Sequence, residues 1–219
     1  MSQKYTINFH KVYPYLTLVI YSFFVYLMIR ITLKYIDFNP EAGFLAIKQW
    51  VIHNDIWRAC FYTHVFCSPL LLLAGFSQFF KAKIIGAKVH RSIGKLYVFV
   101  ILFLAAPSGL VMAWYANGGK LGQLAFIILG ILWMVFTYLA YFYAKRRRFR
   151  EHRNYMYRSF ALTLSAITLR SWKYLILQFF NPNPMDAYIL VAWLGFIPNL
   201  IIAEWLIAKQ KYWFFSPRF

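Results

Sequence analysis

Apolar segments of about twenty residues, nearly free of charged side chains, recur along this chain of 219 residues. A helix of about 20 residues is long enough to cross the hydrocarbon of a bilayer. Six such segments are present, at residues 13–33, 57–80, 93–115, 121–144, 156–180 and 187–208. A membrane-spanning segment of this length satisfies its backbone hydrogen bonds as a helix. We therefore expect an all-α, polytopic integral membrane helical bundle, built as a single transmembrane domain over residues 1–219.

The distribution of charge orients these spans. The formal net charge is +18, and lysine and arginine gather in the amino-terminal arm, the 81–91 and 145–153 connections and the 209–219 tail. Four of the six acidic residues lie in the connections on the other side: Asp37, Glu41, Asp55 and Asp186. Because cations concentrate on the cytoplasmic side of membrane proteins, both termini are predicted to be cytoplasmic. The same pattern favours anionic lipid head groups over nucleic acid as the partner of the basic face.

The stretch from Lys145 to Arg170 joins a run of cations to an apolar segment. Read as a helix, it places small and polar residues on one stripe, and its other faces are Leu, Ile, Phe and Tyr. In a membrane helix such a stripe should face protein or a ligand. Its members are His152, Met156, Ser159, Thr163, Ala166 and Arg170.

Two histidines are predicted to lie at one depth. His90 precedes the third span and His152 precedes the fifth, both on the cytoplasmic side. Neutral imidazoles from facing helices are what a six-coordinate b-type haem needs as axial ligands. We therefore predict a haem-binding electron-transfer protein. The propionates would pair with Arg91, Arg153 or Arg158. Gly94 and Ser159 would leave room for the haem, and Tyr97 would border its edge.

Other readings of these residues stay open. His90, His152 and Glu204 are a possible transition-metal site, and so are Cys60, His64 and Cys67 on one helix face. His64 and Arg170 lie further out, where a quinone or a proton path is conceivable, and with Glu204 they suggest a transporter route. An accessory subunit of a larger membrane complex, with a redox partner or without one, is a third class. In a further reading, both histidines simply lie at helix starts in a wet interface and bind no ligand. No Ser-His-acid arrangement supports hydrolysis.

Two motifs resemble a known family. His90-Arg91-x-x-Gly94-x-x-Tyr97 is followed about sixty residues later by His152-x-x-x-Met156-x-Arg158-Ser159-x-Ala161-Leu162-Thr163 and then Arg170. This pattern is similar to the bacterial multi-pass membrane proteins catalogued as domain of unknown function 2306, although Tyr155 stands where tryptophan is expected. The resemblance implies a location in the bacterial cytoplasmic membrane and assigns no reaction. It raises the weight of His64, His90, His152, Arg158 and Arg170 as a functional set.

Overall fold

The computed structural model describes residues 9–79, 86–180 and 182–209, and side chains from residue 15 onward. The described part is helical and contains no strand, as predicted. Its α-helices are α1 (Phe9–Leu33), α2 (Asp55–Ser77), α4 (Ala87–Val100), α5 (Ala106–Trp114), α6 (Gly119–Lys145), α7 (Phe149–Thr163), α8 (Ser165–Phe180), α9 (Pro184–Leu194) and α10 (Ile197–Ala208). A 3-10 helix, η1 (Gly43–Ile47), and a π-helix, η2 (Ile101–Ala105), complete the set.

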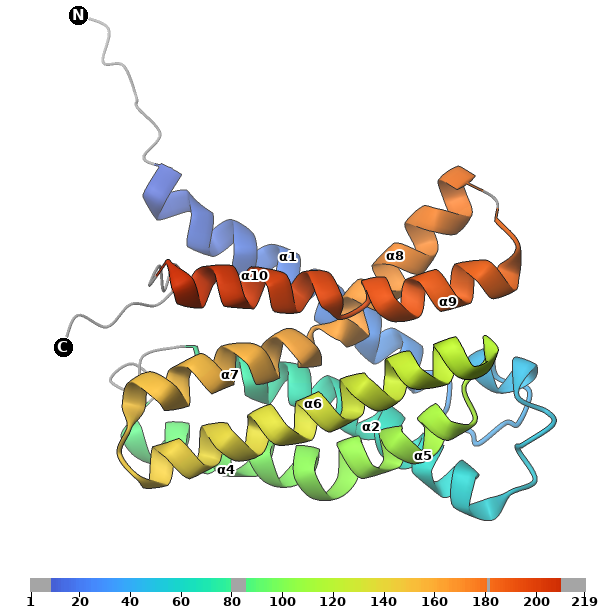
Figure 1. Ribbon diagram of the computed structural model, residues 1–219, viewed down its shortest axis with the longest axis horizontal. Helices are drawn as coiled ribbons and strands as arrows, with labels where there is room; N and C mark the ends of the chain where they lie inside the picture. The colour runs from blue at the N-terminus through green and yellow to red at the C-terminus, as the bar shows by residue number, and fades with distance from the viewer. Residues whose placement is uncertain (1–8, 80–85, 181, 210–219) are drawn as a thin grey trace, which may run out of the picture.

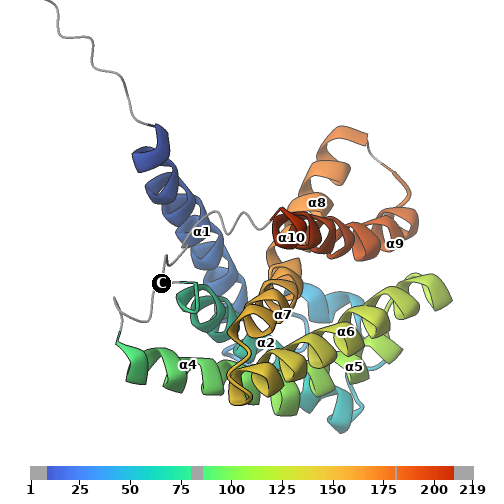
Figure 2. The same ribbon diagram turned by 60° about the vertical axis from the view of Figure 1, so that its left-hand side comes forward.

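Four rods form the centre of the molecule: α2, the continuous α4–η2–α5 rod, α6 and α7 (Figure 1). Their shared core is apolar and includes Leu71, Ile101, Ala125 and Leu162. Helix α1 and the α8–α9–α10 segment lie along one side of this bundle (Figures 1 and 2). Among the described residues, five stretches are long and apolar enough to cross a membrane: Tyr15–Leu33, Asp55–Ser77, Ala87–Trp114, Gly119–Lys145 and Pro184–Ala208. The prediction of an all-α membrane bundle is confirmed.

The predicted span at 156–180 is not one continuous helix. Helix α7 begins earlier, at Phe149, and ends at Thr163, and α8 continues in a different direction (Figure 1). The amide nitrogen of Asn199, on α10, donates to the carbonyl oxygen of Ala161 at 3.1 Å, and Ser165 Oγ donates to Leu162 O at 2.5 Å. Side chains that take up helix carbonyls bend helices. The bend therefore arises from a contact with α10, which the apolar pattern alone does not reveal.

The third predicted span, 93–115, begins earlier, at Ala87, and contains a π-helical turn at Ile101–Ala105. Pro107 follows this turn and has no backbone N–H, so Phe103 loses the donor that a regular helix would supply. A widened turn accommodates the missing bond, and such π-bulges are frequent at functional sites. The sixth predicted span, 187–208, is likewise divided, because α9 ends at Leu194 and Pro198 lies in the first turn of α10.

A buried lysine holds the outer end of the bundle together. Lys48, directly after η1, is only 1% exposed. Its Nζ donates to the carbonyl oxygen of Tyr115 at 2.5 Å and to Asn117 Oδ1 at 2.6 Å, both in the α5–α6 turn. The rings of Phe44 and Trp50 lie 5.7 and 5.1 Å from the same nitrogen. Loss of water around the ammonium lowers the pKa of Lys48 to about 8.

This pKa predicts that stability rises with pH. An unfolded lysine has a pKa near ~10.4, so the unfolded chain binds more protons than the folded chain between about pH 8 and that value. The cost of burying the charge is fully present below about pH 8 and is lost progressively as the pH rises from there to the pKa of the unfolded lysine, a gain of about 3 kcal/mol. Thermal unfolding in detergent should show a midpoint that rises between these pH values. Lys48→Met should remove that part of the slope, and an unchanged slope would contradict the prediction.

Candidate functional site

His152 lies in the first turn of α7 in a defined tautomer. Its Nδ1 is 2.8 Å from the carbonyl oxygen of Ala140 on α6. A carbonyl oxygen only accepts, so Nδ1 carries the hydrogen and Nε2 of the neutral ring keeps its lone pair. Histidines that ligate metals almost always donate their other N–H in this way. His152 is therefore oriented as a ligand would be.

His90 lies at the same end of the bundle, in the first turn of α4 (Figure 1). Its Nδ1 is buried and has no hydrogen-bond partner within the part of the chain that the structure describes. A buried polar atom without a partner costs about 1–3 kcal/mol, and in a native structure it points to a ligand or water that completes the site. The structure thus places two imidazoles near the starts of α4 and α7, one in a ligand tautomer and one with an unsatisfied nitrogen.

Some of the residues predicted to surround a haem contact other parts of the protein instead. Arg158 is engaged elsewhere: its Nε and Nη2 donate to the two oxygens of Glu204 on α10, at 2.5 and 2.8 Å. Gly94 faces α2, where a Cβ would lie 2.8 Å from Gln78 Oε1. Arg91 is exposed and its Nε donates to Ala87 O at 3.1 Å. Of the three predicted arginines, Arg158 pairs with Glu204 on α10. Arg91 lies near the start of α4 and Arg153 near the start of α7.

A network of hydroxyl groups fills the bundle centre, about two helical turns beyond the histidines. Tyr97 Oη lies 3.0 Å from Ser159 Oγ and 2.7 Å from Thr163 Oγ1. Thr137 Oγ1 lies 2.7 Å from Ser159 Oγ, and Trp133 Nε1 donates to Thr163 Oγ1 at 3.1 Å. Tyr97, Thr137 and Ser159 are fully buried. Polar side chains that bond across helices join membrane helices in this way, here α4, α6 and α7.

One arrangement of hydrogens satisfies the whole network. Thr163 donates to the backbone oxygen of Ser159 at 3.1 Å, so its Oγ1 accepts from Tyr97 and Trp133. Tyr97 then accepts from Ser159, and Ser159 accepts from Thr137. Every hydroxyl hydrogen has an acceptor, which is the condition for burying such groups without penalty. The stripe of small and polar residues predicted that Ser159 and Thr163 face the interior. The haem prediction placed Tyr97 at the edge of the cofactor, whereas Tyr97 belongs to this network.

Removing the central hydroxyl is expected to destabilise the bundle. In Tyr97→Phe the hydrogen of Ser159 loses its acceptor in a buried site, a cost of about 1–2 kcal/mol. Unfolding of the purified protein in mixed micelles with increasing dodecyl sulfate measures this loss. Tyr138→Phe is the matched control, because Tyr138 lies on α6 and is 53% exposed. Equal stability of the two variants would show that the network is not a stabilising element.

His64 occupies a separate position beside the π-turn. Its Nδ1 lies 2.8 Å from the carbonyl oxygen of Ala105, the last residue of η2, so this ring also keeps its lone pair on Nε2. Gly109 lets the ring approach, since a Cβ there would lie 3.0 Å from His64 Cε1. Ala105 is about 20 Å along its rod from His90, too far for a shared cofactor. Arg170, on α8, donates from Nη1 to Ala166 O at 2.6 Å.

The predicted three-ligand metal sites are not assembled. Among the residues that the structure describes, no three His, Cys, Asp or Glu side chains gather where they could hold a metal ion. Glu204 pairs with Arg158 and does not join His90 and His152. Cys60 and Cys67 are free thiols on α2. Of the residues suggested for a transporter route, Arg170 donates to Ala166 O and Glu204 pairs with Arg158.

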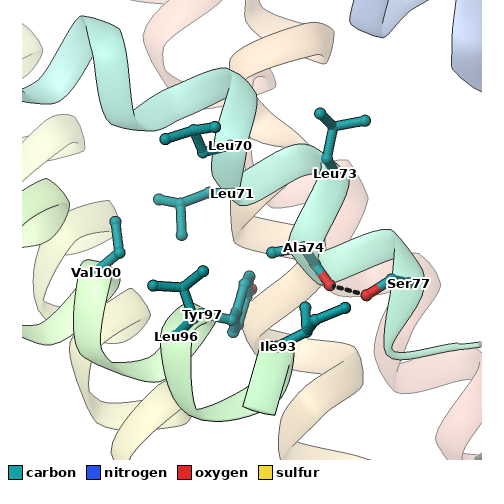
Figure 3. A pocket seen from close by; sticks show the side chains of 9 residues that line it. All are labelled: Leu70, Leu71, Leu73, Ala74, Ser77, Ile93, Leu96, Tyr97 and Val100. Carbon is teal, nitrogen blue, oxygen red and sulfur yellow. Dashed lines mark hydrogen bonds between the residues drawn. The ribbon is translucent and has the colours of Figure 1, made fainter. Parts of the chain in front are cut away.

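A hollow of about 270 Å³ lies between α2 and α4, beside the network. Figure 3 shows leucine and isoleucine side chains on its walls and the ring of Tyr97 among them. Ser77 lines one end, and its hydroxyl donates to Ala74 O at 2.7 Å (Figure 3). The lining is apolar and its own polar group is satisfied, so the hollow suits a hydrocarbon chain and offers no reactive group.

The fold and this arrangement define a multi-pass α-helical membrane protein. The chain belongs to the family described as predicted membrane protein, DUF2306, whose model matches residues 61–207, about two thirds of the chain. The family resemblance read from the two motifs is thereby confirmed. No curated protein and no solved structure matches the chain.

Proposed function

We propose that this protein is an electron-transfer protein of the bacterial cytoplasmic membrane and holds one b-type haem between His90 and His152. The observation that carries the proposal is the hydrogen bond from His152 Nδ1 to Ala140 O, which leaves Nε2 ready to ligate iron. The buried, unsatisfied Nδ1 of His90 at the same end supports it.

The neighbouring residues suit the charges of this cofactor. Arg91 and Arg153 would offer guanidinium groups to its propionates, and Arg158 with Glu204 would hold α10 against α7 at the edge of the site. The fully bonded Tyr97 network would fix the helices on which both histidines lie. A bound haem supplies one-electron chemistry, and the protein sets its orientation and charge environment. Contacts between the basic inner face and anionic lipids would orient the protein further.

Absorption spectroscopy tests the proposal. Protein purified in detergent from haem-replete cells should show a Soret band that shifts on reduction with dithionite. His90→Ala and His152→Ala should each lose the low-spin spectrum, and imidazole added to His152→Gly should restore part of it. A colourless wild-type protein would refute haem binding.

Two histidines serve as matched controls. His53→Ala changes an exposed ring near the outer end. His64→Ala changes a ring with the same Nδ1–carbonyl bond at a different depth. Both variants should keep the spectrum. Loss of haem in His64→Ala together with an unchanged spectrum in His90→Ala would show that the ligands are assigned incorrectly.

A further inference from the structure

A second hollow of about 270 Å³ lies between α1, α2, α7 and α10. Its lining includes Tyr21, Phe76, Phe160, Asn199 and Ala203. Helices α1 and α10, which both contribute to this lining, lie on the same side of the bundle (Figure 2), and Ile202, also in the lining, is exposed at 56%. Because these helices face lipid, the hollow can be reached from within the bilayer. Its volume is near the lower end of ordinary ligand pockets, about 300 Å³.

The walls of this cavity are built from aromatic rings. Tyr21 and Phe76 stack with centroids 4.1 Å apart at an interplanar angle of 17°. Phe79 lies 4.9 Å from Phe160 and 5.2 Å from Tyr157 at tilted angles. Aromatic faces and edges arranged in this way favour a flat ring as occupant, because stacked and edge-on pairs gain about 0.5–1.5 kcal/mol beyond burial. The first hollow, beside Tyr97, has mainly aliphatic walls and lacks this feature.

Two polar side chains in the lining, those of Tyr21 and Asn199, can offer a ligand only hydrogen-bond acceptors. The only hydroxyl hydrogen of Tyr21 is donated to Leu72 O at 2.7 Å. The amide nitrogen of Asn199 donates to Ala161 O, Thr168 Oγ1 and Gly195 O at 3.1, 3.0 and 3.2 Å. The hydrogens of both side chains are therefore used within the protein, and what they can offer a ligand is an oxygen lone pair. A ligand that matches them carries its own O–H groups.

We propose that this cavity binds the head group of a prenylated quinol. The aromatic walls would hold the flat ring, the oxygens of Tyr21 and Asn199 would accept its hydroxyl hydrogens, and the tail would leave between α1 and α10 into the lipid. Tyr157, in the lining, follows His152 on α7 by about 7 Å along the axis. The quinol would thus lie beside the proposed haem, but its binding does not depend on haem.

Binding is tested with decylubiquinol, kept reduced under anaerobic conditions, on the full chain in lipid nanodiscs. The quinol should raise the thermal unfolding midpoint and bind about tenfold more tightly than the corresponding quinone, which lacks hydroxyl hydrogens. Ala203→Leu fills the cavity and should weaken binding at least tenfold. Tyr21→Phe keeps the ring, removes one acceptor and should weaken binding about fivefold.

Ala74→Leu is the matched control. It places the same side chain in the first hollow, on α2, and should leave quinol binding unchanged. An unchanged midpoint in the wild type, binding that survives Ala203→Leu, or an equal effect of decanol would overturn the proposal. The last result would identify the cavity as a seat for a lipid chain. Because the test needs no haem, quinol binding by a haem-free protein would refute only the proposed function, and absent binding by a haem-loaded protein would refute only this inference.

Discussion

Replacement of Gly75 by leucine should destabilise the bundle by about 3 kcal/mol, because it overpacks a well-filled core. Gly75 lies on α2 against α4 and α7. A Cβ at this position would lie 2.7 Å from Phe160 Cδ2 and 2.8 Å from Tyr97 Cε2. Neither ring is the flexible end of a long side chain, and Tyr97 is held by its hydrogen bonds. Unfolding in mixed micelles, followed by far-ultraviolet circular dichroism, measures the loss.

A pair of alanine variants provides the control for this prediction. Gly75→Ala meets both rings, whereas Gly94→Ala meets only the flexible end of Gln78. Both gain about 1 kcal/mol of helix propensity, so Gly94→Ala should be neutral or stabilising and Gly75→Ala should be the less stable of the two. Equal stability of the two variants would show that the rings move aside at little cost.

Loss of the Arg158 guanidinium should cost about 2 kcal/mol, because it leaves the Glu204 carboxylate without its partner between α7 and α10. The Arg158 side chain is 20% exposed and that of Glu204 is 52% exposed, which places the expected value below that of a fully buried pair. Arg158→Ala should therefore loosen α10 and raise proteolysis or hydrogen exchange in that helix. The unfolding transition of the purified variant gives the magnitude.

A double variant separates the ion pair from the rest of the side chain. Arg158→Leu combined with Glu204→Leu removes both charges and should be more stable than either single variant. Arg58→Ala is the control, since its pair with Asp55 is exposed at 49% and 83% and should matter by about 0.5 kcal/mol or less. Additive effects of the two leucine substitutions would contradict a direct coupling between α7 and α10.

The sequence predicted several features of the candidate site and missed others. Helical spacing indicated that Ser159 and Thr163 face the interior, and both are buried. The position of His90 and His152 at span starts indicated a common depth. The motif marked Tyr97 as a cofactor edge and did not reveal its place in the network, because that place depends on two hydroxyls of α7.

Long-range pairs were the hardest to foresee. Lys48 reads as a cation in a loop, and only the approach of the α5–α6 turn explains its burial. Arg158 and Glu204 are each isolated charges in the sequence, and their pairing requires that α10 return beside α7. Tertiary packing decides which polar and charged groups pair. The sequence around each charge carries little information about that packing.

By itself the sequence determined that this chain is a multi-pass helical membrane protein, because length and apolarity leave a lipid-embedded backbone few other forms. Its two histidine motifs indicated the DUF2306 family. The tertiary structure alone decided where α7 bends, which carbonyls fix the tautomers of His64 and His152, and which helices enclose the aromatic cavity. These features arise from contacts between residues far apart in the chain. Periodicity places a side chain on a face of its helix, but it does not specify the partner that this face meets.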